Sequence, residues 1–278
     1  MEGRGVVIHN VCPMRAEPSG EAEQVSQAIF GETVRIVGQS GAYVRIQTPD
    51  AYEGWVLQKH LAPLSGGGAY PEASRAAAVA SLFLPVLPQP SEGSERITLL
   101  TLGTLLEVVQ PDAAPGYCSV KLPDGRIAYV AASGLTDPPA PAKDLGRSLV
   151  EAARKLIGVP YLWGGRTPFG MDCSGFVQRL YWLCGTTIPR DAHEQAASNA
   201  FEEVDLGDAQ GGDLLFFGSG TGMDREGITH VGMCLGDGRF IHSAGAFGVI
   251  VTPMDDPGYR AMFRCARRMH AAAQKPAS

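Results

Sequence analysis

The chain lacks long hydrophobic runs and any excess of basic residues. No stretch approaches the roughly eighteen consecutive apolar residues that a membrane-spanning helix needs, and residues 1–6 hold no apolar core of a signal peptide. Lys and Arg number 23 against 29 Asp and Glu, so the formal net charge is −6. An acidic chain offers no electrostatic footprint for nucleic acid or for an anionic lipid surface. We therefore expect a protein with no membrane span and no nucleic-acid partner.

The chain also lacks paired cysteines. Its six cysteines form no CxxC pair and are Cys12, Cys118, Cys173, Cys184, Cys234 and Cys265. Scattered single cysteines are typical of a reducing compartment, so we expect a cytoplasmic protein; export is the alternative if a signal peptide has been removed. Structural zinc motifs bring ligands in close pairs such as C-x₂₋₄-C or H-x₃₋₅-H, which are absent. We expect no metal and no cofactor. The competing hypothesis is a zinc site formed by Cys173, Cys234, His230 and His242.

Two linkers divide the chain. At 278 residues it exceeds what one hydrophobic core usually organises. The Gly-rich segment 65–68 and the Pro-rich segment 137–141 are the clearest breaks in composition. They predict three domains, at 1–65, 69–138 and 142–270.

The first two domains are predicted to be repeats. They share a series of landmarks, which are Pro18, Gly31, Tyr43, Trp55 and Leu61 in the first and Pro90, Gly103, Tyr117, Tyr129 and Leu135 in the second. The intervals from proline to glycine, from tyrosine to the second aromatic residue and from there to leucine are equal in the two copies. Short strands with Gly and Pro turns in about sixty residues indicate a small β-barrel in each copy. Trp55 is predicted to be a core aromatic residue.

A cysteine is predicted at the start of a helix. Residues 170–176 read Gly-Met-Asp-Cys-Ser-Gly-Phe, apolar residues then recur at helical spacing up to Cys184, and Gly185 ends the helix. Cys173 therefore lies at the helix N-terminus, where unpaired N–H groups favour an anion. We expect its pKa to fall below the ~8.5 of a free cysteine. Cys173 is the candidate nucleophile.

Two later strands are predicted to form a hairpin. They are 230–235 and 239–243, joined by Gly-Asp-Gly at 236–238. A three-residue turn whose last glycine is left-handed pairs Gly232 with His242. His230 and His242 then share a face, about 7 Å apart on the diagonal, whereas a two-residue turn would place them on opposite faces.

Cys173 and this histidine pair are the parts of a nucleophilic site. In this interpretation His230 takes the proton of Cys173 and returns it to the leaving amine, while His242 orients His230. Helical spacing at 145–157 and further strands at 213–217 and 248–252 place helices first and an antiparallel meander afterwards. That order predicts an α+β fold.

With these residues in place, the last ~130 residues resemble the NlpC-type cell-wall peptidases, which are papain-like cysteine enzymes. The resemblance is carried by Tyr-Leu-Trp-Gly-Gly at 161–165, Asp-Cys-Ser-Gly-Phe at 172–176, Gly-Asp-Leu-Leu-Phe-Phe at 212–217, Thr-His-Val-Gly at 229–232 and Ile-His-Ser at 241–243. It implies a papain-like domain of helices packed on an antiparallel sheet. It also implies that Cys173 is the nucleophile, His230 the base and His242 the orienting residue, and that the hydroxyl of Tyr161 helps to hold the oxyanion.

The first domain resembles the bacterial SH3-like domains of cell-wall enzymes. The motifs are Arg-Ala-Glu-Pro at 15–18, Gly-Glu-Thr-Val at 31–34 and Tyr-Glu-Gly-Trp-Val at 52–56. The second domain resembles them more weakly, since Ala-Tyr-Val at 128–130 replaces Gly-Trp-Val. The resemblance therefore implies two SH3-like barrels ahead of the peptidase domain.

This combination resembles the endopeptidases that cleave peptidoglycan stem peptides between γ-linked D-glutamate and a diamino acid, and that require a free N-terminal L-alanine. An ammonium entering a partly dry site needs a carboxylate. The residues implied for this contact are Asp191, Glu23 and Tyr52, although Asp191 also fits a capping box with Glu194. Arg190 and Ser174 are implied to meet the α-carboxylate of D-glutamate.

The expected partner is thus a small stem peptide, bound by a monomer. Two other functions remain open from the sequence. One is a protein that anchors itself on peptidoglycan through its barrels, and the other is an amidase or acyltransferase on the same scaffold.

Overall fold

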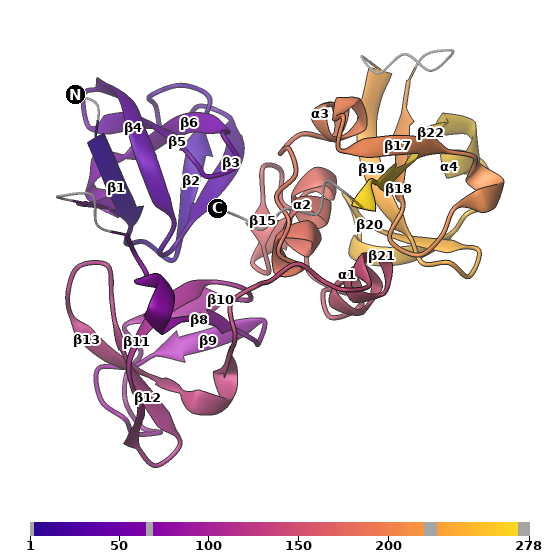
Figure 1. Cartoon of the computed structure of the whole chain (residues 1–278). Coiled ribbons are helices and arrows are strands. Elements are labelled where there is room, and N and C mark those ends of the chain that lie inside the picture. The colour runs from indigo at the N-terminus through magenta and orange to yellow at the C-terminus, as the bar shows by residue number, and fades with distance from the viewer. Residues whose placement is uncertain (1–2, 65–68, 220–226, 272–278) are drawn as a thin grey trace. The chain divides into compact units, whose positions relative to one another are not determined.

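The structure is a computed structural model that describes residues 3–64, 69–219 and 227–271. The predicted linker at 65–68 and most of the glycine-rich segment after the strand at 213–217 lie outside the described residues. The chain divides into two compact units, Met1–Pro138 and Pro139–Ser278 (Figure 1). The division falls inside the predicted proline linker. No helix among the described residues is both long enough and apolar enough to span a membrane.

The first half of the first unit is one seven-stranded antiparallel sheet. Its order is β3-β2-β6-β5-β4-β1-β7. The strands are β1 Gly3–Val7, β2 Val11–Arg15, β3 Gln24–Ile29, β4 Thr33–Ser40, β5 Tyr43–Gln47, β6 Glu53–Leu57 and β7 Leu61–Pro63, with the 3₁₀ turn η1 Gln58–His60 before β7. Alternate residues of these strands bury a core of small and branched apolar side chains, including Val7, Met14, Val44, Ile46 and Val56.

The second half of the unit repeats this topology. A five-stranded sheet has the order β13-β12-β11-β8-β14, and β9 pairs separately with β10. The strands are β8 Ala76–Val79, β9 Phe83–Val86, β10 Thr98–Thr101, β11 Leu105–Ala114, β12 Tyr117–Lys121, β13 Ile127–Ala131 and β14 Leu135–Thr136, with 3₁₀ turns η2 Ala73–Arg75 and η3 Ala132–Gly134. The order β13-β12-β11-β8-β14 matches β6-β5-β4-β1-β7 strand for strand, so the predicted repeat is confirmed.

The two copies also share details. Gly31 and Gly103 lie at the same point of the repeat and both have a left-handed backbone, with φ of +81° and +78°. Phe30, from the first copy, is 3% exposed and belongs to the hydrophobic core of the second copy, together with Val79 and Leu84. One buried side chain of the first copy therefore forms part of the core of the second. The separate domain ranges 1–65 and 69–138 stay a prediction.

The prediction that Trp55 is a core residue is wrong. Gly54 and Val56 are the buried residues of this part of β6, and Trp55 is half-buried on the opposite face. It pairs with Arg15 on β2 and Arg45 on β5. Successive residues of a strand point to opposite faces, so Trp55 cannot join Val56 in the core.

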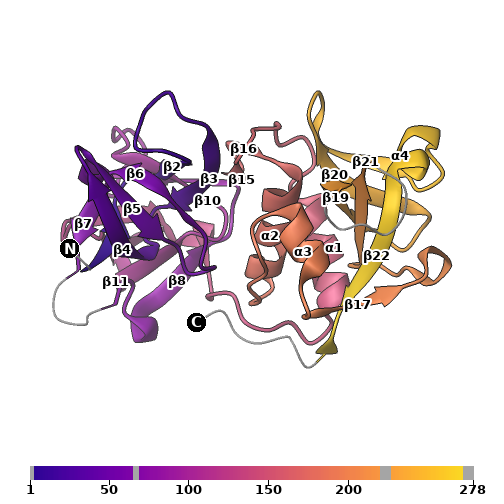
Figure 2. The ribbon, with the colours of Figure 1, turned by 90° about the horizontal axis from the view of Figure 1, so that it is seen from above.

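The second unit has the expected α+β fold. Its six-stranded antiparallel sheet has the order β17-β22-β18-β19-β20-β21. The strands are β17 Phe201–Val204, β18 Leu214–Gly218, β19 Ile228–Cys234, β20 Arg239–Ala244, β21 Gly248–Pro253 and β22 Phe263–Met269, and a separate short hairpin joins β15 Arg166–Thr167 to β16 Gly170–Met171. The helices are α1 Leu145–Arg154, α2 Cys173–Leu183, α3 Ala192–Ala197 and α4 Pro257–Met262, with the 3₁₀ turn η4 Leu206–Asp208. Helices α1, α2 and α3 gather on one side of the sheet and α4 lies on the other (Figure 2).

Candidate active site

Asp172 begins helix α2 and thereby places Cys173 in its first turn. The Asp172 carboxylate accepts hydrogen bonds from the backbone N–H of Gly175 at 2.7 Å and of Gly164 at 2.9 Å. An N-cap carboxylate of this kind satisfies donors that the helix itself cannot. Cys173 is the first helical residue, so the predicted position of the nucleophile at a helix N-terminus is confirmed.

A buried arginine holds that carboxylate. The two terminal nitrogens of Arg190 donate to the two oxygens of Asp172 at 3.1 and 2.6 Å, and one of them also donates to Oγ of Ser174 at 2.9 Å. Arg190 is 1% exposed and Asp172 is 7% exposed. The structure thus places Arg190 and Ser174 against Asp172. Their implied contact with a substrate carboxylate stays a prediction.

Close backbone contacts fix the start of α2. A Cβ added at Gly175 would lie 2.2 Å from the carbonyl oxygen of Gly165, and one added at Gly165 would lie 2.3 Å from that of Gly170. No side chain fits at these separations. The glycines in the two motifs therefore allow the first turn of α2 to lie directly against the β15–β16 hairpin.

The histidine hairpin has the predicted register. Met233 pairs with Ile241, which aligns Gly232 with His242, and a Cβ added at Gly232 would lie 3.2 Å from Cβ of His242. Nε2 of His230 lies 2.8 Å from Nδ1 of His242. His242 is fully buried and His230 is partly exposed. The structure therefore confirms that both rings lie on one face of the hairpin and that they contact each other.

Aromatic side chains enclose the two imidazole rings. Phe240 stacks on His242 with ring centroids 4.7 Å apart, and Tyr259 of α4 meets the same ring edge-on at 4.8 Å. Tyr259 and Phe217 also lie within 6 Å of the His230 ring. Burial lowers the pKa of His230 to about 4 and that of His242 to about 3, the neighbouring His230 contributing to the second shift. Both rings are neutral at pH 7.

The prediction of an acidic thiol is wrong. Cys173 is 8% exposed, and burial together with the nearby Asp172 carboxylate raises its pKa to about 11, although the backbone N–H groups of Val231 and Ser174 favour the thiolate. A helix N-terminus supplies typically about 0.3–1 kcal/mol, less than one pKa unit, so burial dominates. Burial therefore favours the neutral thiol in the resting site. Its proton must therefore pass to a base as the sulfur attacks.

Tyr161 lies beside the nucleophile. It is half-buried and forms an isolated bridge with Met171, two residues before Cys173. Burial raises the pKa of Tyr161 to about 12, and the negative charge of a Cys173 thiolate contributes to this shift. The Tyr161 hydroxyl is thus protonated and able to donate. Its part in holding an oxyanion stays a prediction.

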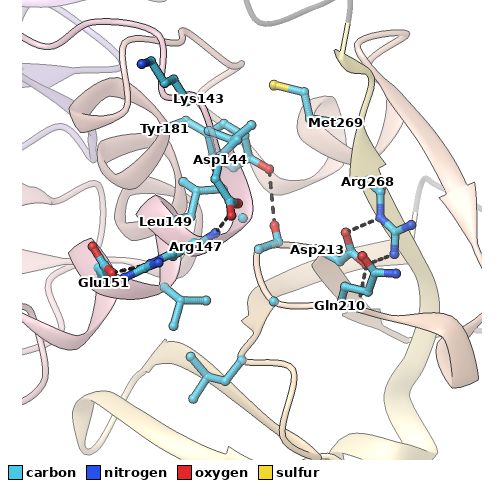
Figure 3. A pocket seen from close by; sticks show the side chains of 16 residues that line it. Lys143, Asp144, Arg147, Leu149, Glu151, Tyr181, Gln210, Asp213, Arg268 and Met269 are labelled. Atoms are coloured by element: carbon cyan, nitrogen blue, oxygen red, sulfur yellow. Dashed lines mark hydrogen bonds and ion pairs between the residues drawn. The ribbon is translucent and has the colours of Figure 1, made fainter.

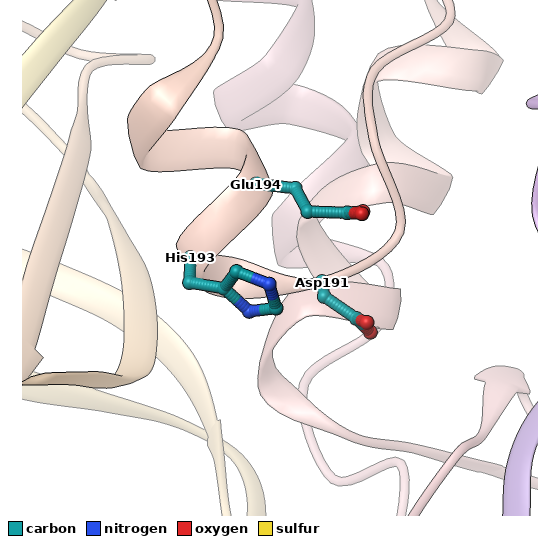
Figure 4. A group of neighbouring side chains, drawn as sticks. All are labelled: Asp191, His193 and Glu194. Atoms are coloured by element: carbon teal, nitrogen blue, oxygen red, sulfur yellow. The ribbon is translucent and has the colours of Figure 1, made fainter. Parts of the chain in front are cut away.

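Asp191 occupies the N-cap position of α3, but the capping box with Glu194 is wrong, because no side-chain cap hydrogen bond forms. Instead, oxygens of the two carboxylates and a ring nitrogen of His193 lie within 4.8 Å of one another (Figure 4). Negative charge is therefore concentrated at Asp191. Glu23 and Tyr52 belong to the first unit, Glu23 exposed just before β3 and Tyr52 packed on the barrel core. The contact of all three with a substrate amine stays a prediction.

The competing zinc site is not formed. Among the described residues, Asp191, His193 and Glu194 are the one group of three or more potential ligands that lie close enough to share an ion. Cys234 is 1% exposed, and its Sγ contacts Met254 in the core. It does not converge with Cys173 and the histidine pair.

A separate cavity of about 800 Å³ lies between the start of α1, the segment 210–213 that precedes β18, and the end of β22 (Figure 3). Two ion pairs belong to its lining: Arg147 contacts Glu151 at 2.9 Å and Arg268 contacts Asp213 at 2.7 Å. None of the predicted catalytic residues lines it. The cavity is therefore not part of the candidate active site.

Sequence reasoning did not assign roles to Thr252 or Tyr259. Oγ1 of Thr252 lies 2.9 Å from Nε2 of His242, and Tyr259 covers both histidine rings. The alternation of β21 could have placed Thr252 on the side of His242. Nothing in the spacing of α4 indicated where its tyrosine would lie.

We expect the second unit to lose stability in acid because of the two buried histidines. Unfolded histidine has a pKa near 6.5. Between about pH 6.5 and 4 the unfolded chain therefore binds protons that the folded site does not, and the free energy of unfolding falls as the pH falls. Calorimetric unfolding temperatures at pH 7 and pH 4.5 measure this slope. His242→Asn should reduce it, and an unchanged slope in that variant would contradict the assignment.

Comparisons with known proteins agree with the motifs. Residues 158–268 match the NlpC/P60 family, and residues 14–61 match the bacterial dipeptidyl-peptidase Sh3 domain. A Bacillus cereus protein named gamma-D-glutamyl-L-lysine dipeptidyl-peptidase is 31% identical over 87% of this chain and 74% of its own length. A Bacillus subtilis protein of the same name is 31% identical over 78% of this chain and 71% of its own length.

A solved structure shows the same fold. The crystal structure of an NlpC/P60 family protein from Bacillus cereus superimposes with a TM-score of 0.82, at 24% identity, and the match covers 96% of this chain and 99% of that chain. At this identity the likeness concerns the fold alone.

Proposed function

Because the chain belongs to the NlpC/P60 family and is a cysteine peptidase, we propose that it hydrolyses the bond between γ-linked D-glutamate and an L-diamino acid in peptidoglycan stem peptides with a free N-terminal L-alanine. The observation that carries this proposal is the His230–His242 hydrogen bond at 2.8 Å, in a unit whose helix α2 begins at Cys173. The names of the two Bacillus relatives supply the substrate class.

Hydrolysis proceeds by two acyl transfers. Sγ of Cys173 attacks the γ-carbonyl carbon while His230 takes the thiol proton, and the oxyanion meets backbone N–H groups at the start of α2 with the Tyr161 hydroxyl. His230 then protonates the amine of the diamino acid as the C–N bond breaks. Water, activated by His230, hydrolyses the thioester and releases the L-Ala-D-Glu dipeptide. The neutral imidazole and protonated thiol are the correct starting states for this order of proton transfers.

Recognition of a free N-terminal amine requires a carboxylate in the site, because burying an unpaired ammonium is costly. An ammonium that loses water needs an opposite charge, and Asp191 presents a half-buried carboxylate close to a second carboxylate, that of Glu194. Asp191 is therefore the residue of the second unit that we assign to the N-terminal amine. The sequence-based roles of Glu23 and Tyr52 are part of the same proposal.

The test is the digestion of four tripeptides. L-Ala-γ-D-Glu-L-Lys and its diaminopimelate counterpart are each supplied with a free or an acetylated alanine. We expect release of the free diamino acid from the unblocked peptides and at least about a tenfold lower kcat/KM for the acetylated ones, the scale of one lost charge-assisted contact. The ratio between the two unblocked peptides gives the preferred diamino acid.

Each alternative has its own result. Equal rates with free and acetylated alanine would contradict amine recognition. Cleavage at another bond would indicate an amidase. Sedimentation with purified sacculi, without hydrolysis of any of the four peptides, would favour a wall-binding protein.

A further inference from the structure

The hydrogen bond between the two histidines continues to a third side chain. Thr252 lies on β21, is 8% exposed, and its Oγ1 is 2.9 Å from Nε2 of His242. His230 on β19, His242 on β20 and Thr252 on β21 thus form one line of hydrogen bonds across neighbouring strands. We propose that Thr252 is a positioning residue whose hydroxyl accepts from His242 and fixes the tautomer that lets His230 act as the base. This inference rests on the proposed function and adds a residue to its site.

The tautomers follow from the order of the atoms. Nε2 of His230 faces His242, so Nδ1 is the ring nitrogen that remains for the thiol proton. A neutral imidazole carries one N–H and one bare nitrogen. If Nδ1 of His230 is bare, its Nε2 carries the proton and donates to Nδ1 of His242. His242 must then carry its own proton on Nε2, which donates to Oγ1 of Thr252.

The opposite order would disable the base. If the Thr252 hydroxyl donated to a bare Nε2, His242 would carry its proton on Nδ1 and donate to His230. The proton of His230 would then occupy the nitrogen that has to receive one. The role of His230 as the base requires the first order, because its Nδ1 must be bare to accept the proton of Cys173.

Burial makes the Thr252 contact decisive for His242. The imidazole of His242 is 0% exposed and lies between Phe240 and Tyr259, so solvent does not replace a lost partner. An unpaired N–H at such a position is costly. Removing the hydroxyl therefore removes the preference for a proton on Nε2 of His242.

Nitrogen-15 NMR of the resting wild-type protein measures the tautomers directly. Two-bond ¹⁵N–¹H correlations at pH 7 are expected to show both His230 and His242 protonated on Nε2. A proton on Nδ1 of His242 would overturn the proposal. This measurement needs no substrate, so it stands apart from the outcome of the tripeptide digestion.

The kinetics of three threonine variants provide a second, independent test of the role of Thr252. Thr252→Val keeps the side-chain shape but removes the acceptor, and we expect a roughly tenfold lower kcat with KM within about twofold of wild type. Thr252→Ser restores the hydroxyl and should recover kcat to within about threefold. The matched control is Thr186→Val, because Thr186 is 2% exposed and its Oγ1 has no hydrogen-bond partner among the described residues.

The outcomes separate positioning from simple support of the fold. A normal kcat in Thr252→Val, or an equal loss in Thr186→Val, would overturn the proposal. Failure of the serine variant to recover kcat would overturn it as well. If the wild type cleaves none of the tripeptides, the proposed substrate fails, whereas the NMR result still decides the tautomer.

Discussion

Cys173→Ala is expected to reduce kcat/KM for the unblocked tripeptides by at least about 10⁴, since a nucleophilic enzyme without its nucleophile retains only binding and electrostatic effects. The cause is specific to the sulfur. Asp172 still caps α2, and the histidine pair does not depend on the Cys173 side chain for its own hydrogen bonds. The fold of the second unit should therefore persist while the chemistry stops. Release of the diamino acid, followed by chromatography, measures the effect.

Cys184→Ala is the matched control. Cys184 is also buried, at 5% exposed, and lies at the opposite end of the same helix. Its thiol has no assigned part in catalysis, so activity should stay within about threefold of wild type at a temperature where the variant is folded. Retention of more than about 1% of wild-type activity in Cys173→Ala would exclude Cys173 as the nucleophile.

Arg190→Met is expected to destabilise the second unit by about 3–5 kcal/mol, because it leaves the Asp172 carboxylate buried without its cation. The pair is bidentate, with both residues nearly excluded from solvent. Loss of the arginine also releases the carboxylate that holds the first turn of α2, so activity should fall together with stability. Hydrogen exchange of the α2 amides reports the free energy of unfolding of this unit without interference from the first.

Arg147→Met provides the comparison. Arg147 contacts Glu151 at 2.9 Å, but both side chains are more than 60% exposed, and such helical surface pairs contribute only about 0.3–0.5 kcal/mol. Pairing Arg190→Met with Asp172→Ala should cost less than the sum of the two single changes, because neither charge is then stranded. An Arg190→Met effect no larger than that of Arg147→Met would contradict this account of the pair.

The parts of the site that follow from local rules were predictable from the sequence. The start of α2 follows from Asp172 as an N-cap, and the facing of His230 and His242 follows from the two glycines around Asp237. Both features are decided within a dozen residues of chain. The repeat of the first unit was equally visible, because its landmark residues fall on equivalent strands and turns of the two copies.

The parts that depend on long-range packing were not predictable. The pKa of Cys173 depends on how deeply the folded unit buries the sulfur, and a local motif carries no information on that depth. Strand β22 was missed as well. It lies between β17 and β18, yet Arg264, Arg267 and Arg268 interrupt its apolar pattern. Two of these arginines are accommodated by the carbonyl of Phe201 and by the carboxylate of Asp213, which lie far away in the sequence.

The burial of Phe30 in the core of the second copy limits how far the two copies can be separated in engineered proteins. Since the second barrel completes its interior with a ring from the first, the copies are not interchangeable modules. If the second copy were grafted alone into another protein, the apolar side chains that contact Phe30 would be exposed. An aromatic residue from the new neighbour would have to cover them.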